Sequence, residues 1–118
     1  MRVGANIMAY IASFDIGSSA IKAVLLDQQG GMHHACSQDY AVSDDAPGEQ
    51  SPQLWWDSFV AVLRQWWAQG VLPTSLKALT FSGQMQDMIA LDERGEVVRP
   101  AVLYMDARAG DQAATASA

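Results

Sequence analysis

The sequence predicts an α/β fold in which a mixed sheet packs against a helix. Two apolar segments at residues 9–14 and 21–26 and a loosely alternating segment at 32–42, separated by short turns, predict an antiparallel β-meander. An amphipathic segment that begins at Ser51 predicts a helix, and residues 76–82 predict a further strand. A meander followed by a helix and another strand is typical of α/β folds with a mixed sheet.

The meander is defined by its turns as much as by its strands. Residues 9–14 are apolar and partly β-branched or aromatic, and they lead directly to Asp15. Gly-Ser-Ser at residues 17–19 predicts a tight turn before the second strand. Asp-Gln-Gln-Gly-Gly at residues 27–31 predicts another turn before the third strand.

The helix has a start signal and a stop signal. Ser51 suits the N-cap, Pro52 suits the first helical position, and Gly70 suits the C-terminal end. Large apolar side chains recur between them at helical spacing: Trp55, Phe59, Val62, Leu63 and Trp66. This wide apolar face indicates packing against the sheet rather than a cage for an aromatic ligand.

The remaining segments are short. The polar residues 43–50 include Pro and Gly and predict a loop. Residues 87–91 predict a short strand, residues 92–95 a hairpin turn, and residues 101–104 another short strand. A second helix is expected to begin at Ala107.

Size and charge exclude several classes of partner. The 118 residues suffice for one small domain, and the net charge of −6 argues against nucleic acid and anionic membranes as main partners. No apolar run approaches the ~18 residues of a membrane span, and the start has no signal-peptide pattern, so a cytoplasmic location is expected. Residues 1–8 are interpreted as an N-terminal extension. Cys36 is the single cysteine, and His33 and His34 are interpreted as ordinary strand residues.

A first group of candidate site residues surrounds the first turn. Asp15 can hold Mg²⁺ through water, and Gly17 lets the backbone approach a ligand closely. The N–H groups of a turn such as Ser18-Ser19 can bind an anion, and Lys22 follows shortly after. This combination suits a nucleotide phosphate and its metal ion, although a plain hairpin turn explains the same residue types.

Two further polar groups follow predicted strands. Ser-Gly-Gln-Met-Gln-Asp at residues 82–87 suits a small polar ligand such as a polyol, because Gln84 can donate to and accept from a hydroxyl. A hydrophilic turn is the alternative. Asp106 could accept hydrogen bonds from sugar hydroxyls or cap a helix, and Arg108 could pair with a nearby carboxylate.

The order and spacing of these segments resemble the N-terminal region of the FGGY carbohydrate kinases, especially their xylulose-kinase-like members. The segments that carry the resemblance are Phe-Asp-Ile-Gly-Ser-Ser-Ala-Ile-Lys at residues 14–22, Glu-Gln-Ser-Pro-Gln-Leu-Trp-Trp at 49–56, Ser-Gly-Gln-Met-Gln-Asp at 82–87, Leu-Asp-Glu-Arg-Gly at 91–95 and Arg-Pro-Ala-Val-Leu-Tyr-Met-Asp-Ala-Arg at 99–108. Together they cover nearly everything from Ala9 to Gln112.

The resemblance implies a fold and an activity. These kinases belong to the actin/Hsp70/hexokinase superfamily, so it implies an incomplete ribonuclease-H-like (actin-like ATPase) fold, with residues 9–118 as the N-terminal portion of the first kinase domain. It implies transfer of a phosphoryl group from ATP to a sugar hydroxyl with the help of Mg²⁺. The residues it assigns are Asp15 to the metal ion, Gly17, Ser18, Ser19 and Lys22 to the ATP phosphates, and Gln84, Met85, Gln86, Asp106 and Arg108 to the sugar.

Four residues depart from the xylulose-kinase-like pattern. Gln86 stands where the family has His, Asp87 where it has Gly, Tyr104 where it has Trp, and Met105 where Asn is common. Because these positions face the sugar, the departures leave the identity of the sugar open.

The family's length bears on activity. Its members run to several hundred residues in two domains, and the resemblance places their general-base aspartate and most of the nucleotide pocket beyond the region matched here. We therefore expect these 118 residues alone not to phosphorylate a sugar. Two alternatives stay open: a non-catalytic module that binds a sugar or phosphate, and a remnant that forms a homodimer through unpaired sheet edges.

Overall fold

The computed structural model describes residues 8–41 and 46–117, which form two compact units. Unit 1 comprises Met1–Tyr40 and Trp55–Gln84, and unit 2 comprises Ala41–Leu54 and Met85–Ala118. Apart from Met8, the expected N-terminal extension lies outside the described residues. No helix in the described ranges is long and apolar enough to cross a membrane.

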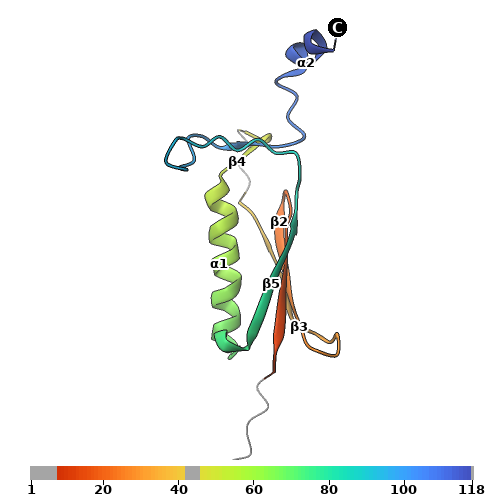
Figure 1. Cartoon of the computed structure of the whole chain (residues 1–118), viewed down its shortest axis with the longest axis vertical. Helices are drawn as coiled ribbons and strands as arrows, with labels where there is room; N and C mark the ends of the chain where they lie inside the picture. Colours follow the sequence, from red (N-terminus) through yellow and green to blue (C-terminus); the bar gives the residue numbers. More distant parts are fainter. Residues whose placement is uncertain (1–7, 42–45, 118) are drawn as a thin grey trace, which may run out of the picture. The chain divides into compact units, whose positions relative to one another are not determined.

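Unit 1 is built on a four-stranded sheet with the order β3-β2-β1-β5 (Figure 1). β1 (Tyr10–Ile16), β2 (Ala20–Leu26) and β3 (Met32–Asp39) form the predicted antiparallel meander. β5 (Leu76–Gly83) follows a 3-10 turn, η1 (Pro73–Ser75), and pairs with β1 in parallel. The predicted mixed sheet is therefore confirmed.

Two strand boundaries differ from the sequence-based expectation. β1 continues to Ile16, so Asp15 lies within the strand and not beyond its end. The reason is pairing on both sides, since Asp15 is opposite Lys22 in β2 and Ser82 in β5. β3 ends at Asp39, and the expected end at Val42 falls outside the described residues.

Helix α1 (Pro52–Ala68) covers one face of the sheet (Figure 1). It begins at Pro52 as predicted, and Gly70, with φ of +92°, follows its end in the left-handed conformation that favours glycine. The ring of Phe14 in β1 lies 4.9 Å from that of Phe59 and 5.4 Å from that of Trp66. The largest fully buried side chains come from the sheet and the helix: Trp66, Phe14, Ile21, Leu25 and Val62.

The two histidines have structural partners within unit 1. Trp66 Nε1 donates a hydrogen bond of 2.9 Å to the carbonyl of His34, whose φ of 51° marks an irregularity in β3. His33 Nε2 lies 2.7 Å from Asp27 Oδ2, while Asp27 Oδ1 accepts hydrogen bonds from the turn N–H groups of Gln29 and Gly31. These contacts agree with the interpretation of both histidines as strand residues.

Unit 2 contains a small two-stranded sheet. β4 (Glu49–Gln50) pairs antiparallel with β6 (Ala101–Val102), so the expectation of a loop through residue 50 is wrong at Glu49 and Gln50. Residues 87–91 do not form the expected strand: Met88 and Leu91 make isolated bridges, to Val102 and Val97.

The end of unit 2 turns before it becomes helical. Asp106 Oδ1 accepts a hydrogen bond from the N–H of Arg108, which holds the chain in a local turn. Helix α2 (Gly110–Ala116) consequently begins three residues after the expected Ala107, and Ala109 rather than Asp106 occupies its N-cap. The hairpin turn is confirmed, because Gly95 donates to the carbonyl of Asp92.

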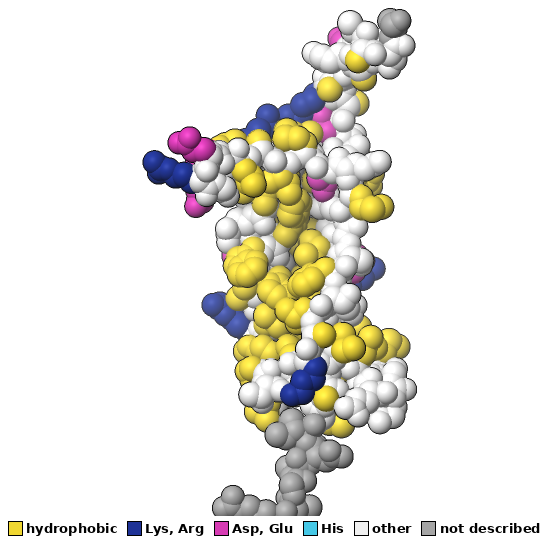
Figure 2. All heavy atoms as spheres, viewed as in Figure 1, with side chains coloured by type: hydrophobic (Ala, Val, Ile, Leu, Met, Phe, Trp, Pro, Cys, Tyr) yellow, Lys and Arg dark blue, Asp and Glu magenta, His cyan; other side chains and the backbone are white. Residues whose placement is uncertain are grey.

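Hydrophobic side chains gather on the flank of unit 1 between α1 and β5 (Figure 2). Leu79 and Phe81 of β5 are about half exposed there, at 47% and 53%, and Trp56 of α1 is 60% exposed. Phe81 nevertheless stacks on Phe14, with ring centroids 5.4 Å apart. β5 therefore ends the described sheet with apolar side chains open to solvent.

Candidate functional site

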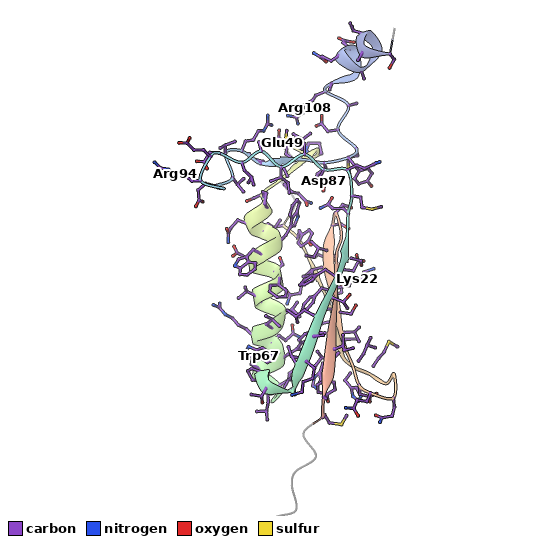
Figure 3. The ribbon with its side chains drawn as sticks, viewed as in Figure 1. Lys22, Glu49, Trp67, Asp87, Arg94 and Arg108 are labelled. Atoms are coloured by element: carbon purple, nitrogen blue, oxygen red, sulfur yellow. The ribbon has the colours of Figure 1, made fainter. Side chains whose placement is uncertain are left out.

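The first candidate site is a polar row across the face of the sheet that α1 does not cover. Phe14 faces the helix, so its neighbour Asp15 points to the opposite side. Lys22 is directly opposite Asp15 in β2, and Ser82 is its partner in β5. Ser82 Oγ donates a hydrogen bond of 3.1 Å to Asp15 Oδ1. Figure 3 places Lys22 on the side of the sheet away from α1.

A turn rich in small residues lies beside this row. The N–H of Gly17 donates to the carbonyl of Ala20 over 3.0 Å, which closes the turn and leaves Ser19 exposed. Gln84 reaches the same turn, because its Nε2 donates to the carbonyl of Gly17 over 3.4 Å. A Cβ at Gly83 would lie 2.7 Å from the carbonyl oxygen of Ile16, so only glycine allows this approach.

The polar row opens into a shallow hollow of about 480 Å³ in unit 1. Its lining comes from β1, β2 and β3: Ser13, Asp15, Lys22, Ala23, Val24, Ala35, Cys36 and Ser37. A carboxylate and an ammonium group thus face the same open space. The nearby Tyr40 is buried, and its burial together with the charge of Asp15 raises its pKa to about 12, so the phenol stays protonated at neutral pH.

The chemistry of this donor set fits a hydrated Mg²⁺ ion better than a fully protein-bound one. The described residues contain no group of three or more His, Cys, Asp or Glu side chains that could hold a metal ion. Mg²⁺ usually keeps several waters and is held by one or two carboxylates together with substrate phosphates. Asp15 can serve as such a carboxylate, and the ammonium group of Lys22 has the charge that would attract a phosphate.

The second candidate site lies in unit 2, where the segment 85–88 runs beside residues 102–104. Met88 and Val102 exchange backbone hydrogen bonds of 2.9 and 3.0 Å. Met85 is 77% exposed, and Gln86 has φ of 67°, a backbone conformation that residues other than glycine rarely adopt. Such conformations concentrate at ligand-binding sites, where surrounding contacts hold them.

Asp87 explains one departure from the family pattern. Its Oδ1 accepts a hydrogen bond of 2.9 Å from the N–H of Tyr104. The carboxylate therefore ties the 85–88 segment to the segment that leads to Asp106. Glycine, which the family pattern has at this position, could not make this contact.

Asp106 is held by an arginine fork. Arg108 donates from Nε to Oδ1 and from Nη2 to Oδ2 of Asp106, each over 2.7 Å. Its Nη1 donates to Glu49 Oε1, also over 2.7 Å, and Arg99 Nη2 donates to the same oxygen. The hydrogen bonds from Arg108 lower the pKa of Asp106 to about 2, and those from Arg108 and Arg99 also lower the pKa of Glu49. Figure 3 labels Glu49 and Arg108 in this cluster.

The structure brings the candidate residues together in two groups. Asp15, Lys22 and the turn contacted by Gln84 belong to unit 1. Met85, Gln86, Asp106 and Arg108 belong to unit 2. Sequence reasoning singled out neither Ser82 as a partner of Asp15 nor Glu49 as a partner of Arg108, although both lie in segments that carried the resemblance.

Comparison with known proteins is consistent with these features. A family model described as "FGGY family of carbohydrate kinases, N-terminal domain" matches residues 10–117. The chain belongs to the FGGY family of carbohydrate kinases. The match covers both units, and the family that the sequence motifs resembled is therefore confirmed.

Individual members of the FGGY family give the extent of the likeness. A xylulose kinase of Escherichia coli (strain K12) is 34% identical over 100 residues, which are 83% of this chain and 20% of that protein. One from Staphylococcus xylosus is 29% identical over 107 residues, 89% of this chain and 22% of that protein. The chain thus spans about a fifth of the length of these relatives.

A solved structure of an FGGY-type kinase extends the likeness to the fold. The crystal structure of xylulose kinase from Rhodospirillum rubrum aligns with a TM-score of 0.78 and 27% identity, covering 92% of this chain and 23% of that one. The predicted actin-like, ribonuclease-H-like sheet, incomplete in this chain, is confirmed by this likeness.

Proposed function

We propose that the chain is the N-terminal part of an ATP-dependent sugar kinase that phosphorylates xylulose or a related ketose or polyol. The observation that carries this proposal is the presence of two polar sites in a chain that belongs to the FGGY family. One site, around Asp15 and Lys22, suits phosphate and Mg²⁺, and the other, around Asp106, suits hydroxyl groups. The relatives named xylulose kinase support the choice of sugar class.

Unit 1 would contribute the phosphate side of the reaction. Asp15 would hold Mg²⁺ through water and would be oriented by Ser82, which donates to its Oδ1. Lys22 and the turn at residues 17–19 would face the ATP phosphates. Bound Mg²⁺ would neutralise charge on the transferred phosphoryl group. Gly17 would contribute the tight turn rather than a hydrogen bond to phosphate, because its N–H donates to the carbonyl of Ala20.

Unit 2 would contribute the sugar side. Asp106 is an acceptor for hydroxyl donors, since its lowered pKa keeps it ionised at neutral pH. The same low pKa makes it a poor general base, so deprotonation of the sugar hydroxyl is assigned to another group. Met85 and Gln86 would also contact the sugar, and Gln84, which belongs to unit 1, would link the end of β5 to the phosphate turn.

We expect binding without turnover from these 118 residues alone. Titration with xylulose, other ketoses, polyols and Mg-ATP, followed by NMR, tests the binding. A coupled ADP-release assay tests the turnover. Saturable binding of a ketose with no ADP release supports the proposal. Robust turnover contradicts the inactivity, and the absence of any sugar binding favours the alternative of a self-associating remnant.

Two further elements of the proposal concern partners and location. We propose that β5, which pairs with β1 and carries the exposed Leu79 and Phe81, is the edge through which the chain forms a homodimer. Sedimentation would reveal a dimer that Phe81→Lys disrupts, whereas a clean monomer at high concentration contradicts it.

We infer a cytoplasmic location from the use of ATP and sugar.

A further inference from the structure

The Asp106 carboxylate is fixed on both of its oxygens. Arg108 binds Oδ1 and Oδ2 through two parallel hydrogen bonds, and its backbone N–H adds a third hydrogen bond to Oδ1 over 2.9 Å. A bidentate fork of this kind sets the plane of the carboxylate as well as its position. The orientation that Asp106 presents to a ligand therefore depends on where the guanidinium group of Arg108 is held.

Glu49 holds that guanidinium group from a distant segment. Its Oε1 accepts from Arg108 Nη1 over 2.7 Å, and 59 residues separate the two in sequence. Arg99 donates to the same oxygen, so two carboxylates and two guanidinium groups balance in charge. Without Glu49, two cations would surround the single carboxylate of Asp106, and Arg108 would keep only its bonds to Asp106.

Gly48 provides the space in which the Asp106 carboxylate lies. A Cβ at Gly48 would be 2.3 Å from Asp106 Oδ2, so the carboxylate would have to shift, and 3.1 Å from its Cγ, a tight contact. The carbonyl of Gly48 accepts a hydrogen bond of 2.9 Å from the N–H of Leu103. The backbone at residue 48 is thereby tied to the turn that carries Asp106, and the close approach is built into unit 2.

The backbone around this cluster is paired and buried. Glu49 is opposite Val102 and Gln50 is opposite Ala101. Ala101 and Gln50 are 0% and 6% exposed. β4 is only two residues long, yet it delivers the Glu49 carboxylate to Arg108 from a fixed backbone. The pairing with Val102 and Ala101 therefore explains why the polar residues Glu49 and Gln50 form a strand, which the sequence did not predict.

We propose that Gly48 and Glu49 are positioning residues for the sugar site. Glu49 holds Arg108, Arg108 holds Asp106, and the missing side chain of Gly48 leaves room for the Asp106 carboxylate. The inference rests on the proposed function for what Asp106 binds. It adds two residues that act through Asp106 without touching the sugar.

The first test follows the Arg108 side chain in the chain labelled with ¹⁵N. Glu49→Gln should speed the exchange of the Arg108 Nε–H with water about 1.5-fold to fivefold, the range expected for losing one partly exposed ion pair. Glu93→Gln, which removes the same charge from the exposed hairpin of unit 2, should leave it unchanged. Equal exchange in the Glu49→Gln and unsubstituted chains overturns the inference.

The second test uses xylulose as the probe in a double-mutant cycle. Glu49→Gln should weaken its binding about threefold or more, because contacting residues in one network are coupled. Glu49→Gln combined with Asp106→Asn should bind no more weakly than Asp106→Asn alone. Losses that add in the double variant would mean that Glu49 does not act through Asp106, and they would overturn the inference.

The third test uses two glycines of unit 2. Gly48→Ala should weaken xylulose binding and raise the pKa of the Asp106 carboxyl, measured from its ¹³C shift, because the carboxylate is displaced from Arg108. Gly110→Ala is the matched control, since a Cβ there meets nothing within 4 Å. An unchanged Asp106 carboxyl in Gly48→Ala overturns the role of Gly48.

The same experiments separate this inference from the proposed function. If the unsubstituted chain binds no xylulose, the proposed function fails. The Arg108 exchange rate and the Asp106 carboxyl shift need no sugar, and they still decide whether Glu49 and Gly48 hold Asp106.

Discussion

Ser82 at the end of β5 donates a hydrogen bond from Oγ to Oδ1 of Asp15 in β1, over 3.1 Å. The two residues are 67 positions apart in sequence and are direct partners in the parallel pairing of the two strands. On its other side, Asp15 faces Lys22. This arrangement fixes the one carboxylate that the account assigns to a metal ion.

Ser82→Ala is expected to weaken Mn²⁺ binding near Asp15 while leaving the fold intact, because the exposed hydroxyl orients the carboxylate and packs against little else. Paramagnetic broadening of NMR signals around Asp15 measures this binding, with Mn²⁺ in place of Mg²⁺. Thr80→Ala, two residues earlier on the same face of β5, is the control and should have no effect. Identical broadening in the two variants contradicts the orienting role.

Asp27 is expected to stabilise unit 1 most at neutral pH. Hydrogen bonds from His33 and the Gly31 backbone lower the pKa of Asp27 from 3.8. A carboxyl with a lowered folded pKa stabilises fully above its unfolded pKa, and that stability is lost as pH falls through the folded value. Urea unfolding of the chain and of Asp27→Asn between pH 2 and pH 7 should show a smaller acid-induced loss in the variant. Parallel pH curves contradict the prediction.

Asp106 is expected to remain ionised down to strongly acidic pH. Its pKa of about 2 means that sugar binding should not change with pH between neutrality and about pH 4. Arg108→Gln should raise the Asp106 pKa toward its ordinary value, as measured by ¹³C NMR. Glu96→Gln, on the hairpin of the same unit, serves as control. A wild-type pKa near the ordinary value would contradict the fork seen in the structure.

Trp66 is expected to be the most sensitive tryptophan of α1. Trp66→Phe leaves the His34 carbonyl without its 2.9 Å donor and opens space in the core, which should cost about 1–3 kcal/mol of the free energy of unfolding. Trp56→Phe, at a position 60% exposed, should cost about 0.5 kcal/mol or less. Urea titration measures both, and equal losses contradict the core assignment.

The elements that the sequence predicted correctly have local signals. The ends of α1 follow from Pro52 and Gly70, whose backbone preferences act within a few residues. The meander follows from turn residues between apolar segments. By contrast, β4 consists of Glu49 and Gln50, which have no strand-forming pattern and pair only because Val102 and Ala101 lie opposite them. Long-range pairing of this kind leaves no mark in the local sequence.

The candidate site residues likewise divide into those whose proximity follows from the local sequence and those that only the fold brings together. Asp15 and Lys22 flank a tight turn, so their antiparallel register and shared face follow from the turn itself. Asp106 and Arg108 are close in sequence, and the possibility of an ion pair was apparent. Glu49 reaches Arg108 across 59 residues, and only the folded unit brings the two together.

The central claim is that unit 2 carries a sugar site organised by Asp106. Site-resolved NMR of the ¹⁵N-labelled chain during titration with xylulose tests it most directly. We predict saturable shifts at Met85, Gln86 and Asp106, with weak affinity of about 1 mM, and weaker but still measurable binding in Asp106→Asn. Shifts that cluster elsewhere, or that persist unchanged in Asp106→Asn, would contradict it.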